Sequence, residues 1–88
     1  MEDAERLKQL VGRRVAEERR ANELTQQQLA ERIGDVSPQY VGLVEQGRQN
    51  LTIETMVKFA NALTVPAKEL FQEPESMDPS PVGRPRKS

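Results

Sequence analysis

The sequence predicts an all-α fold: a small domain of five helices over residues 1–71, followed by a flexible, proline-rich tail with a basic end over residues 72–88. Apolar residues recur at helical spacing as far as Phe71, and no stretch alternates strictly enough to indicate a strand. Residues that cap helices precede the apolar runs. Four of the six prolines follow Phe71, among three acidic and three basic residues, so this segment cannot bury enough apolar surface to fold alone.

The first expected helix ends near Asn22 and carries an apolar stripe on one face. The stripe consists of Leu7, Leu10, Val11 and Val15. Arginine and glutamate fill the opposite face. Pairs on that face such as Arg14 with Glu18 are expected to be solvated neighbours that stabilise the helix by only about 0.3 kcal/mol.

A second helix is predicted to begin after Thr25 and to run to Ile33. Thr25 and Gln28 have the spacing of a capping box, in which the hydroxyl and the amide each satisfy a backbone N–H group at the start of the helix. Gly34 supplies a left-handed stop. This helix is therefore short and has a defined beginning and end.

A third helix is predicted from Ser37 and Pro38, an N-cap followed by proline at the first helical position, and it ends before Gly47. Only three residues around Gly34 join it to the helix before, so the two helices must cross steeply. This is the helix-turn-helix arrangement, whose second helix protrudes far enough to enter the major groove of B-DNA, which is about 12 Å wide. A generic helical bundle produces similar caps and spacing, and it is the alternative on pattern alone.

Thr52 caps a fourth helix whose apolar residues recur at helical spacing. They are Ile53, Met56, Val57, Ala60 and Leu63. Pro66 begins a fifth, short helix that ends near Phe71. Val65, Leu70 and Phe71 offer more apolar surface than so short a helix easily buries on its own bundle, so they are candidates for an isologous contact in a homodimer. Closing the core of the monomer is an alternative role for the same residues.

The composition excludes several classes of function. The chain of 88 residues has no His and no Cys, so it can form no Ser-His-Asp triad, no thiol nucleophile and no structural zinc site. A carboxylate-based enzyme would need two acidic groups in a pocket, which so small a bundle rarely encloses, and we expect no enzymatic activity. No apolar run approaches about 18 residues and the N-terminus is charged, so we expect no membrane span, no secretory signal and a cytoplasmic location.

The stretch LTQQQLAERIGDVSPQYVGLVEQGRQNLTIETMVKFANALTVPAKELF resembles the lambda-repressor-like helix-turn-helix family, the phage-repressor and xenobiotic-response-element regulators. Its most specific motifs are L-T-Q-x-x-L-A, V-S-x-x-x-V-x-x-V-E-x-G and T-I-E-T-M-V-K-F-A-N-A-L, and the likeness covers about residues 7–71. The resemblance implies a five-helix domain that binds double-stranded DNA sequence-specifically, as a repressor or autoregulator and as a homodimer on a two-fold operator. It also implies no cofactor, no metal and no enzymatic activity.

The resemblance places a recognition helix at about residues 37–46 and assigns DNA contacts to eight residues. They are Gln26, Ser37, Pro38, Gln39, Tyr40, Leu43, Arg48 and Asn50. Gln39 is the best candidate for a base contact, because a glutamine amide can pair with adenine N6 and N7. Gln26 matches a glutamine with which the family contacts a backbone phosphate or a base at its edge, with an ordinary polar residue at a helix start as the alternative. Ser37 could offer its hydroxyl or backbone N–H to phosphate, although its role as a helix cap alone would explain it.

The remaining contacts follow from position. Pro38, Tyr40 and Leu43 are expected to share the outward face of the recognition helix. Pro38 and Leu43 could contact only a thymine methyl or exclude water, whereas the Tyr40 hydroxyl could reach a phosphate. Arg48 and Asn50 match the family's backbone-contacting loop, with ordinary solvated side chains as the alternative.

Arg19 and Glu45 match an ion pair that the family usually buries between the first and third helices. The resemblance therefore implies a structural role for both residues. Removing one partner of such a pair costs about 3–5 kcal/mol, because a charge is left uncompensated. The turn is one residue longer than in the short phage form, and Asp35 is best interpreted as the insertion.

The net charge of −1 at pH 7 argues against strong nonspecific attraction to phosphate. The alternative function is therefore a protein-interaction module, in which the helix-turn-helix bundle binds another regulator. The arrangement of charge separates the two hypotheses. A contact face free of carboxylates favours DNA, whereas intrusion of Glu31, Asp35 and Glu54 favours a protein partner.

The segment Gly83 to Lys87 resembles the Gly-Arg-Pro core of an AT-hook, which lies in the narrow minor groove of A·T tracts. Arg84, Arg86 and Lys87 are its candidate DNA contacts. Val82 stands where the fuller motif has an arginine. A solubilising basic end is the alternative interpretation.

Overall fold

The computed structural model describes residues 3–71, and the tail with its AT-hook-like segment lies outside this range. The helices are α1 (Ala4–Ala21), α2 (Gln26–Ile33), α3 (Pro38–Glu45), α4 (Ile53–Leu63) and the 3-10 helix η1 (Ala67–Phe71). The four predicted longer helices are confirmed, and the predicted short fifth helix is a 3-10 helix instead of an α-helix. Glu69 donates its backbone N–H to the Pro66 carbonyl at 2.9 Å, the three-residue hydrogen bond that suits so short a segment.

The predicted capping residues hold the ends of the inner helices. The Gln28 N–H donates to the Thr25 hydroxyl at 3.0 Å, and the Gln28 amide oxygen accepts from the Thr25 N–H at 2.9 Å, so the capping box is confirmed. The Ser37 and Thr52 hydroxyls each accept the backbone N–H three residues further on, so they cap α3 and α4 without a reciprocal bond. Gly34 ends α2 with a φ of +102°, a backbone conformation that residues other than glycine rarely adopt.

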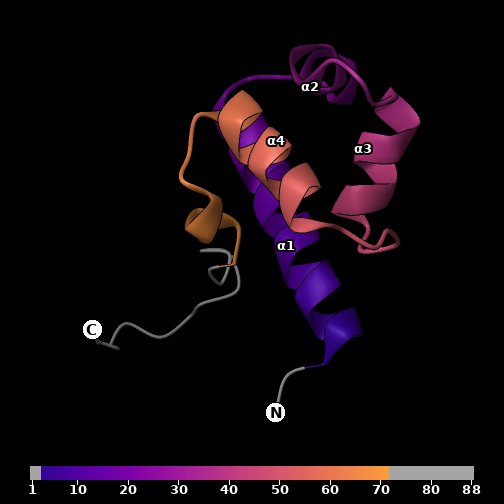
Figure 1. Ribbon diagram of the computed structural model, residues 1–88. Helices are drawn as coiled ribbons and strands as arrows, with labels where there is room; N and C mark the ends of the chain where they lie inside the picture. Colours follow the sequence, from indigo (N-terminus) through magenta and orange to yellow (C-terminus); the bar gives the residue numbers. More distant parts are fainter. Residues whose placement is uncertain (1–2, 72–88) are drawn as a thin grey trace.

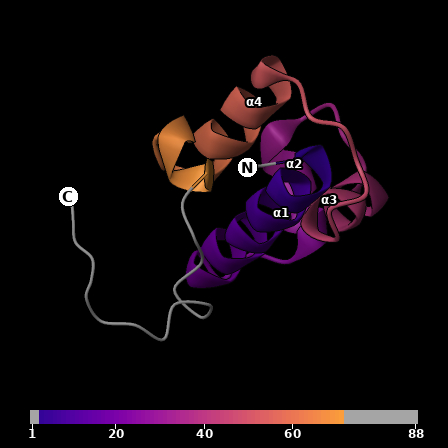
Figure 2. The same cartoon turned by 90° about the horizontal axis from the view of Figure 1, so that it is seen from below.

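Helix α1 is the longest element, and α3, α4 and η1 pack against it (Figure 1). Helix α3 and η1 both contact α1, while α2 contacts α3 and α4. Viewed from below, α4 and η1 lie on one side of α1, and α3 lies on another side (Figure 2). The side chains buried most completely between them are Phe59, Leu29, Leu63, Leu70, Val15, Val41 and Val44. Helix α3 therefore packs against both α1 and α2.

Only part of the apolar surface predicted on α4 and η1 is buried. Leu70, one of the three residues considered for a dimer contact, has no exposed surface and closes the core of the chain. Val65 packs against that core and is partly buried. Ile53, Val57 and Phe71 keep 73%, 41% and 48% of their surface exposed, so an apolar patch remains on the outside.

Gly12 permits the closest approach between α1 and α3. A Cβ atom at this position would lie 2.4 Å from the Val44 carbonyl oxygen and 2.7 Å from that of Glu45. These are backbone atoms, which cannot rotate away as a side chain could. Any larger residue must therefore push the two helices apart.

Arg19 and Glu45 form the ion pair implied by the family resemblance. The Arg19 Nε atom donates to Glu45 Oε2 at 2.6 Å, and its Nη2 atom donates to Oε1 at 3.2 Å. Their side chains are only 13% and 8% exposed. The Arg19 Nη1 atom also donates to the Leu24 carbonyl at 2.8 Å, so one guanidinium joins α1, the loop before α2 and the end of α3.

Arg14 is not the solvated surface residue that its spacing to Glu18 suggested. Its guanidinium is 15% exposed and contacts the carboxylates of Glu17, Glu18 and Glu69 at 2.9–3.1 Å. It also donates to the Glu69 backbone carbonyl at 3.1 Å. Because Glu69 belongs to η1, Arg14 fastens this last helix to α1, an interaction that spacing along α1 could not reveal.

We predict that Gly12→Ala lowers the free energy of unfolding by about 1–3 kcal/mol, because the new methyl group overlaps the α3 backbone. Gly42→Ala is the matched control within a helix. Its Cβ would lie 3.6 Å from the Gln26 side chain, an ordinary contact, so this variant should gain about 1 kcal/mol from helix propensity. Urea unfolding followed by circular dichroism measures both. Equal stability of the two variants would contradict the close approach.

We also predict that Arg19→Ala and Glu45→Ala each lower the free energy of unfolding by about 3–5 kcal/mol, because each leaves a charge without its partner. The double variant should lose less than the sum of the two. Arg20→Ala, which removes the exposed neighbour, should change stability by no more than about 0.5 kcal/mol. Additive losses in the double variant would show that the two charges do not depend on each other.

Candidate nucleic-acid interface

The outer surface of α3 forms a shallow hollow made of uncharged side chains. Val41 and Val44 are buried in the core. Residues on the opposite side of α3, such as Gln39 and Leu43, therefore face outward. The hollow is lined by Gln26, Pro38, Gln39, Gly42, Leu43 and Gln46. Four of these six residues were predicted to contact DNA. They are Pro38, Gln39 and Leu43 of α3 and Gln26 of α2. No charged residue is among the described residues that line it.

Gln26 is tied to the ion pair behind the hollow. Its Nε2 atom donates to Glu45 Oε1 at 3.0 Å, so Glu45 accepts from both Arg19 and Gln26. This contact holds the first residue of α2 against the C-terminal end of α3. The Gln26 side chain is half-buried and has a fixed place at the edge of the hollow.

Ser37 and Gln39 occupy the first turn of α3. The Ser37 hydroxyl accepts the Tyr40 backbone N–H at 3.0 Å, which satisfies one unpaired donor of the helix start. Gln39 is exposed, and its side chain makes no hydrogen bond to any other residue within 3–71. Its amide therefore presents one donor group and one acceptor at the protruding end of the helix.

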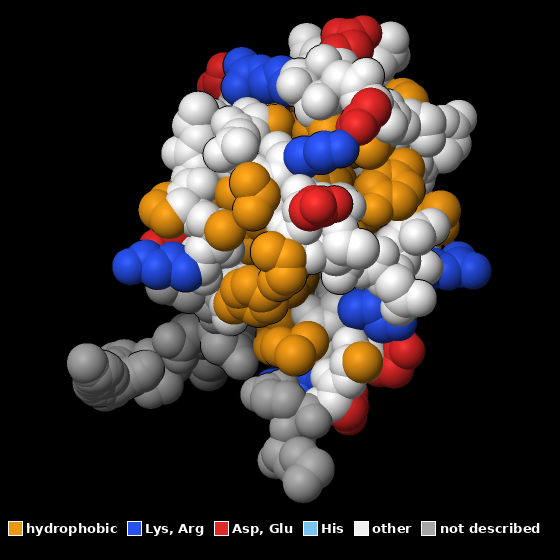
Figure 3. All heavy atoms as spheres, in the orientation of Figure 1, with side chains coloured by type: hydrophobic (Ala, Val, Ile, Leu, Met, Phe, Trp, Pro, Cys, Tyr) orange, Lys and Arg blue, Asp and Glu red, His pale blue; other side chains and the backbone are white. Residues whose placement is uncertain are grey.

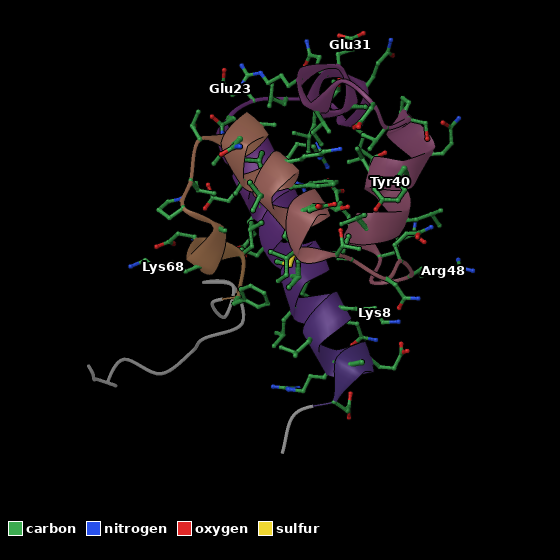
Figure 4. The ribbon with its side chains drawn as sticks, in the orientation of Figure 1. Lys8, Glu23, Glu31, Tyr40, Arg48 and Lys68 are labelled. Atoms are coloured by element: carbon green, nitrogen blue, oxygen red, sulfur yellow. The ribbon has the colours of Figure 1, made fainter. Side chains whose placement is uncertain are left out.

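Tyr40 lies away from this face, contrary to the expectation that it shares the outward side with Pro38 and Leu43. Its ring packs against Phe59 of α4, with the ring centroids 6.3 Å apart. In Figure 4 the labelled Tyr40 side chain lies between α3 and α4. A helical step of about 100° per residue rotates it from the outer face to the flank of α3.

The two loop residues after α3 lie in different surroundings. Arg48 is exposed and extends away from the body beyond the end of α3 (Figure 4). The Asn50 amide oxygen accepts from Lys8 Nζ at 3.3 Å. Asn50 also borders an apolar groove with Leu7 and Phe71 instead of the hollow along α3.

A second hollow between α1 and α3 contains residues that the sequence analysis did not select. It is lined by Arg13, Ala16, Glu17, Arg20, Gln26, Gly42, Glu45 and Gln46. Gln46 belongs to both hollows and lies seven residues after Gln39, two helical turns along the same face. That spacing was visible in the sequence and could have identified Gln46.

The carboxylates that would favour a protein partner lie elsewhere. Lys58 Nζ donates to Asp35 Oδ2 at 2.7 Å, and this contact lowers the pKa of Asp35 and raises that of Lys58. Glu31 lies on the far side of α2, where it accepts from Gln27 at 3.5 Å (Figure 4). Glu54, on α4, lies near Lys58, and its negative charge helps to raise the pKa of that lysine. None of the three acidic residues lines either hollow within the described part of the chain.

The described residues show no site for a metal ion. No group of three or more His, Cys, Asp or Glu side chains between residues 3 and 71 is placed to hold one. No helix in the same range has the length and apolar character to cross a bilayer.

Comparison with known proteins agrees with this geometry. A helix-turn-helix family model matches residues 15–70. The chain is 41% identical over 69 residues to an uncharacterized transcriptional regulator in the ATPase CF(0) region of Rhodospirillum rubrum, covering 78% of this chain and 63% of that protein. It is 41% identical over 64 residues to the HTH-type transcriptional regulator y4dJ of Sinorhizobium fredii, covering 73% of this chain and 82% of the relative.

A solved structure shares the arrangement of the helices. The restriction-modification controller protein C.AhdI from Aeromonas hydrophila is 36% identical and superposes with a TM-score of 0.74, covering 80% of this chain and all of the controller protein. Three findings lead to one assignment. They are the capped helices α2 and α3, the Arg19–Glu45 ion pair that joins α1 to α3, and the family match over most of the folded domain. The chain belongs to the lambda-repressor-like helix-turn-helix family of DNA-binding transcriptional regulators, which are not enzymes.

Proposed function

We propose that this protein regulates transcription by binding a specific double-stranded DNA operator as a homodimer, with residues 37–46 as the recognition helix in the major groove. The observation that carries the proposal is the uncharged outer face of α3, where the exposed Gln39 amide protrudes beside a hollow with no lining carboxylate. A face of this kind can approach base edges without repulsion from the phosphates on either side of the groove.

Each candidate residue has a chemical role in this complex. Gln39 pairs with the N6 and N7 edge of an adenine, while Pro38 and Leu43 pack against a thymine methyl group or exclude water. Gln26 and Ser37 contact phosphate at the starts of α2 and α3, where backbone N–H groups and the helix dipoles favour an anion. Arg48 and Asn50 contact the backbone beyond the end of α3, and Tyr40 contacts it from the α4 flank. Specific recognition then depends on few groups.

The exposed apolar patch formed by Ile53, Val57 and Phe71 supports a homodimer. Figure 3 shows hydrophobic side chains gathered on the face that α4 presents in this orientation. The groove beside the patch is lined in part by Leu7, Ile53 and Phe71, so it connects α1, α4 and η1. A second copy of the chain is the occupant we propose, because a two-fold axis buries the same patch on both subunits at once. Val65 is partly buried against the core, and Leu70 is completely buried in it, so Phe71 is the predicted dimer residue with the most exposed surface.

Repression or autoregulation is the mode of action we propose. A dimer bound across a promoter blocks polymerase sterically and needs no further contact surface for that effect. The net charge of −1 makes nonspecific binding weak, so occupancy depends on the correct operator. The relation to a restriction-modification controller protein is consistent with a regulator of this kind.

Selection of genomic fragments by the purified protein tests the proposal and supplies the operator. We predict that a sequence with two-fold symmetry is enriched. Failure to enrich any fragment would contradict DNA binding and favour the protein-interaction alternative. The roles of single residues are then tested on this operator and on variants with one base pair changed.

We predict that Gln39→Ala weakens operator binding by about 1–3 kcal/mol and relaxes the preference at one base pair in each half-site. Arg48→Ala should instead weaken all sequences alike and reduce the slope of log K against log salt by about 1. Binding titrations on the operator variants at several salt concentrations measure both effects. Identical profiles for the two variants would refute the separate roles.

We predict that Phe71→Ala and Val57→Lys each shift the monomer–dimer equilibrium toward monomer, by about tenfold or more for a contact at the centre of an interface. Both residues are exposed, so neither change should unfold the chain. Lys68→Ala, an exposed substitution in the same 3-10 helix as Phe71, is the control. Sedimentation over a range of concentrations gives the association constants, and an unchanged dimer in both variants would rule out this patch as the interface.

A further inference from the structure

Helix α1 carries two arginine pairs whose surroundings differ sharply. Arg14 and Arg19 are partly buried and bonded to carboxylates, as described above. Arg13 and Arg20 are exposed, and neither side chain makes a hydrogen bond or an ion pair with another residue of the described range. The sequence alone does not distinguish these pairs, because all four residues belong to one charged helix. The structure separates two arginines that hold the fold from two that are available to a ligand.

The two available arginines lie on one face of α1. They are seven residues apart, which places them on the same side of the helix after two turns and separates their Cα atoms by about 10 Å. Both line the hollow between α1 and α3. A span of about 10 Å matches roughly three nucleotides of one DNA strand, at an axial rise of about 3.4 Å each.

This hollow is continuous with the outer face of α3. Gln26, Gly42 and Gln46 line both hollows, so they form the boundary that the two share. Gly42 has no side chain, and a Cβ atom there would contact only the Gln26 side chain, at 3.6 Å. No side chain at position 42 therefore divides the arginine face of α1 from the reading face of α3.

Both carboxylates that line the arginine hollow are bonded to side chains other than Arg13 and Arg20. Glu17 accepts from Arg14 Nη1 at 3.1 Å, and Glu45 accepts from Arg19 and Gln26. The charges of Arg13 and Arg20 are consequently not cancelled by a direct partner within residues 3–71. The hollow therefore offers two guanidinium groups that no carboxylate of the described range binds, beside the proposed recognition helix.

We propose that Arg13 and Arg20 bind the phosphates of the DNA strand that borders the major groove occupied by α3. The inference rests on the proposed function, because α3 must lie in the groove for α1 to meet that strand. Contacts of this kind position the protein and fix its register without reading sequence. They also explain how a domain with no basic excess attracts DNA: two arginines at the correct place replace a general positive charge.

The test is the salt dependence of operator binding by the full chain. Arg13→Ala and Arg20→Ala should each reduce the magnitude of the slope of log K against log salt by about 0.9, and the double variant by about 1.8. Affinity should fall by the same factor on the operator and on its single-base variants. Arg20→Lys should keep most of the slope, because a lysine ammonium still binds phosphate as a point charge.

Lys68→Ala is the matched control for loss of one positive charge. Lys68 is exposed on η1, on the opposite side of the molecule from α3 in Figure 4. It should leave the slope unchanged. If the slopes of Arg13→Ala and Arg20→Ala equal that of Lys68→Ala, the inference is overturned. If operator binding in that case is still weakened by Gln39→Ala, the proposed function remains intact. If the parent chain binds no DNA at all, the proposed function and this inference fail together.

Discussion

The carboxylate of Glu45 accepts hydrogen bonds from α1 and from α2 while it belongs to α3, and the position of the reading helix depends on it. Arg19 reaches it from α1 at 2.6 Å, and Gln26 reaches it from the first residue of α2 at 3.0 Å. Gly12 allows the backbone of α3 to lie directly against α1 beside this contact. A buried ion pair adds little net stability against an apolar replacement, but it restricts the geometry. Here it fixes both the angle and the height at which α3 projects.

This arrangement divides the surface into regions with different chemistry. Charges that support the fold are turned inward, as with Arg14 and Arg19, so the outer face of α3 can be uncharged. The unbonded arginines of α1 stand beside that face. The nearby carboxylates of Glu17 and Glu45 are bonded to Arg14 and Arg19, and Asp35 is bonded to Lys58. The apolar patch on α4 and η1 belongs to a different part of the surface. We therefore expect that substitutions in the proposed DNA-contacting face leave the proposed self-association unchanged.

Much of the fold was predictable because capping residues and apolar spacing act locally. Thr25, Ser37 and Thr52 begin the helices as expected, and Gly34 ends α2. The rest depends on contacts between segments distant in sequence. Nothing in the spacing indicates that Gly12 meets the backbone of α3, or that Arg14 binds Glu69. Tyr40 was assigned to the wrong side of α3 because its attraction to Phe59 comes from α4, and the period of α4 did not show that Ile53 and Val57 lie beyond the edge of the core.

The most direct test of the central claim probes the hydrogen bond between α3 and a base edge. The adenine assigned to Gln39 in the selected operator is replaced by 7-deazaadenine, which removes N7 from the major groove and keeps base pairing. The account predicts that the replacement weakens binding by the parent protein about tenfold, within the range for a specific base contact, and leaves binding by Gln39→Ala almost unchanged. An equal loss for both proteins, or no loss for the parent, would contradict recognition of DNA by this face of α3.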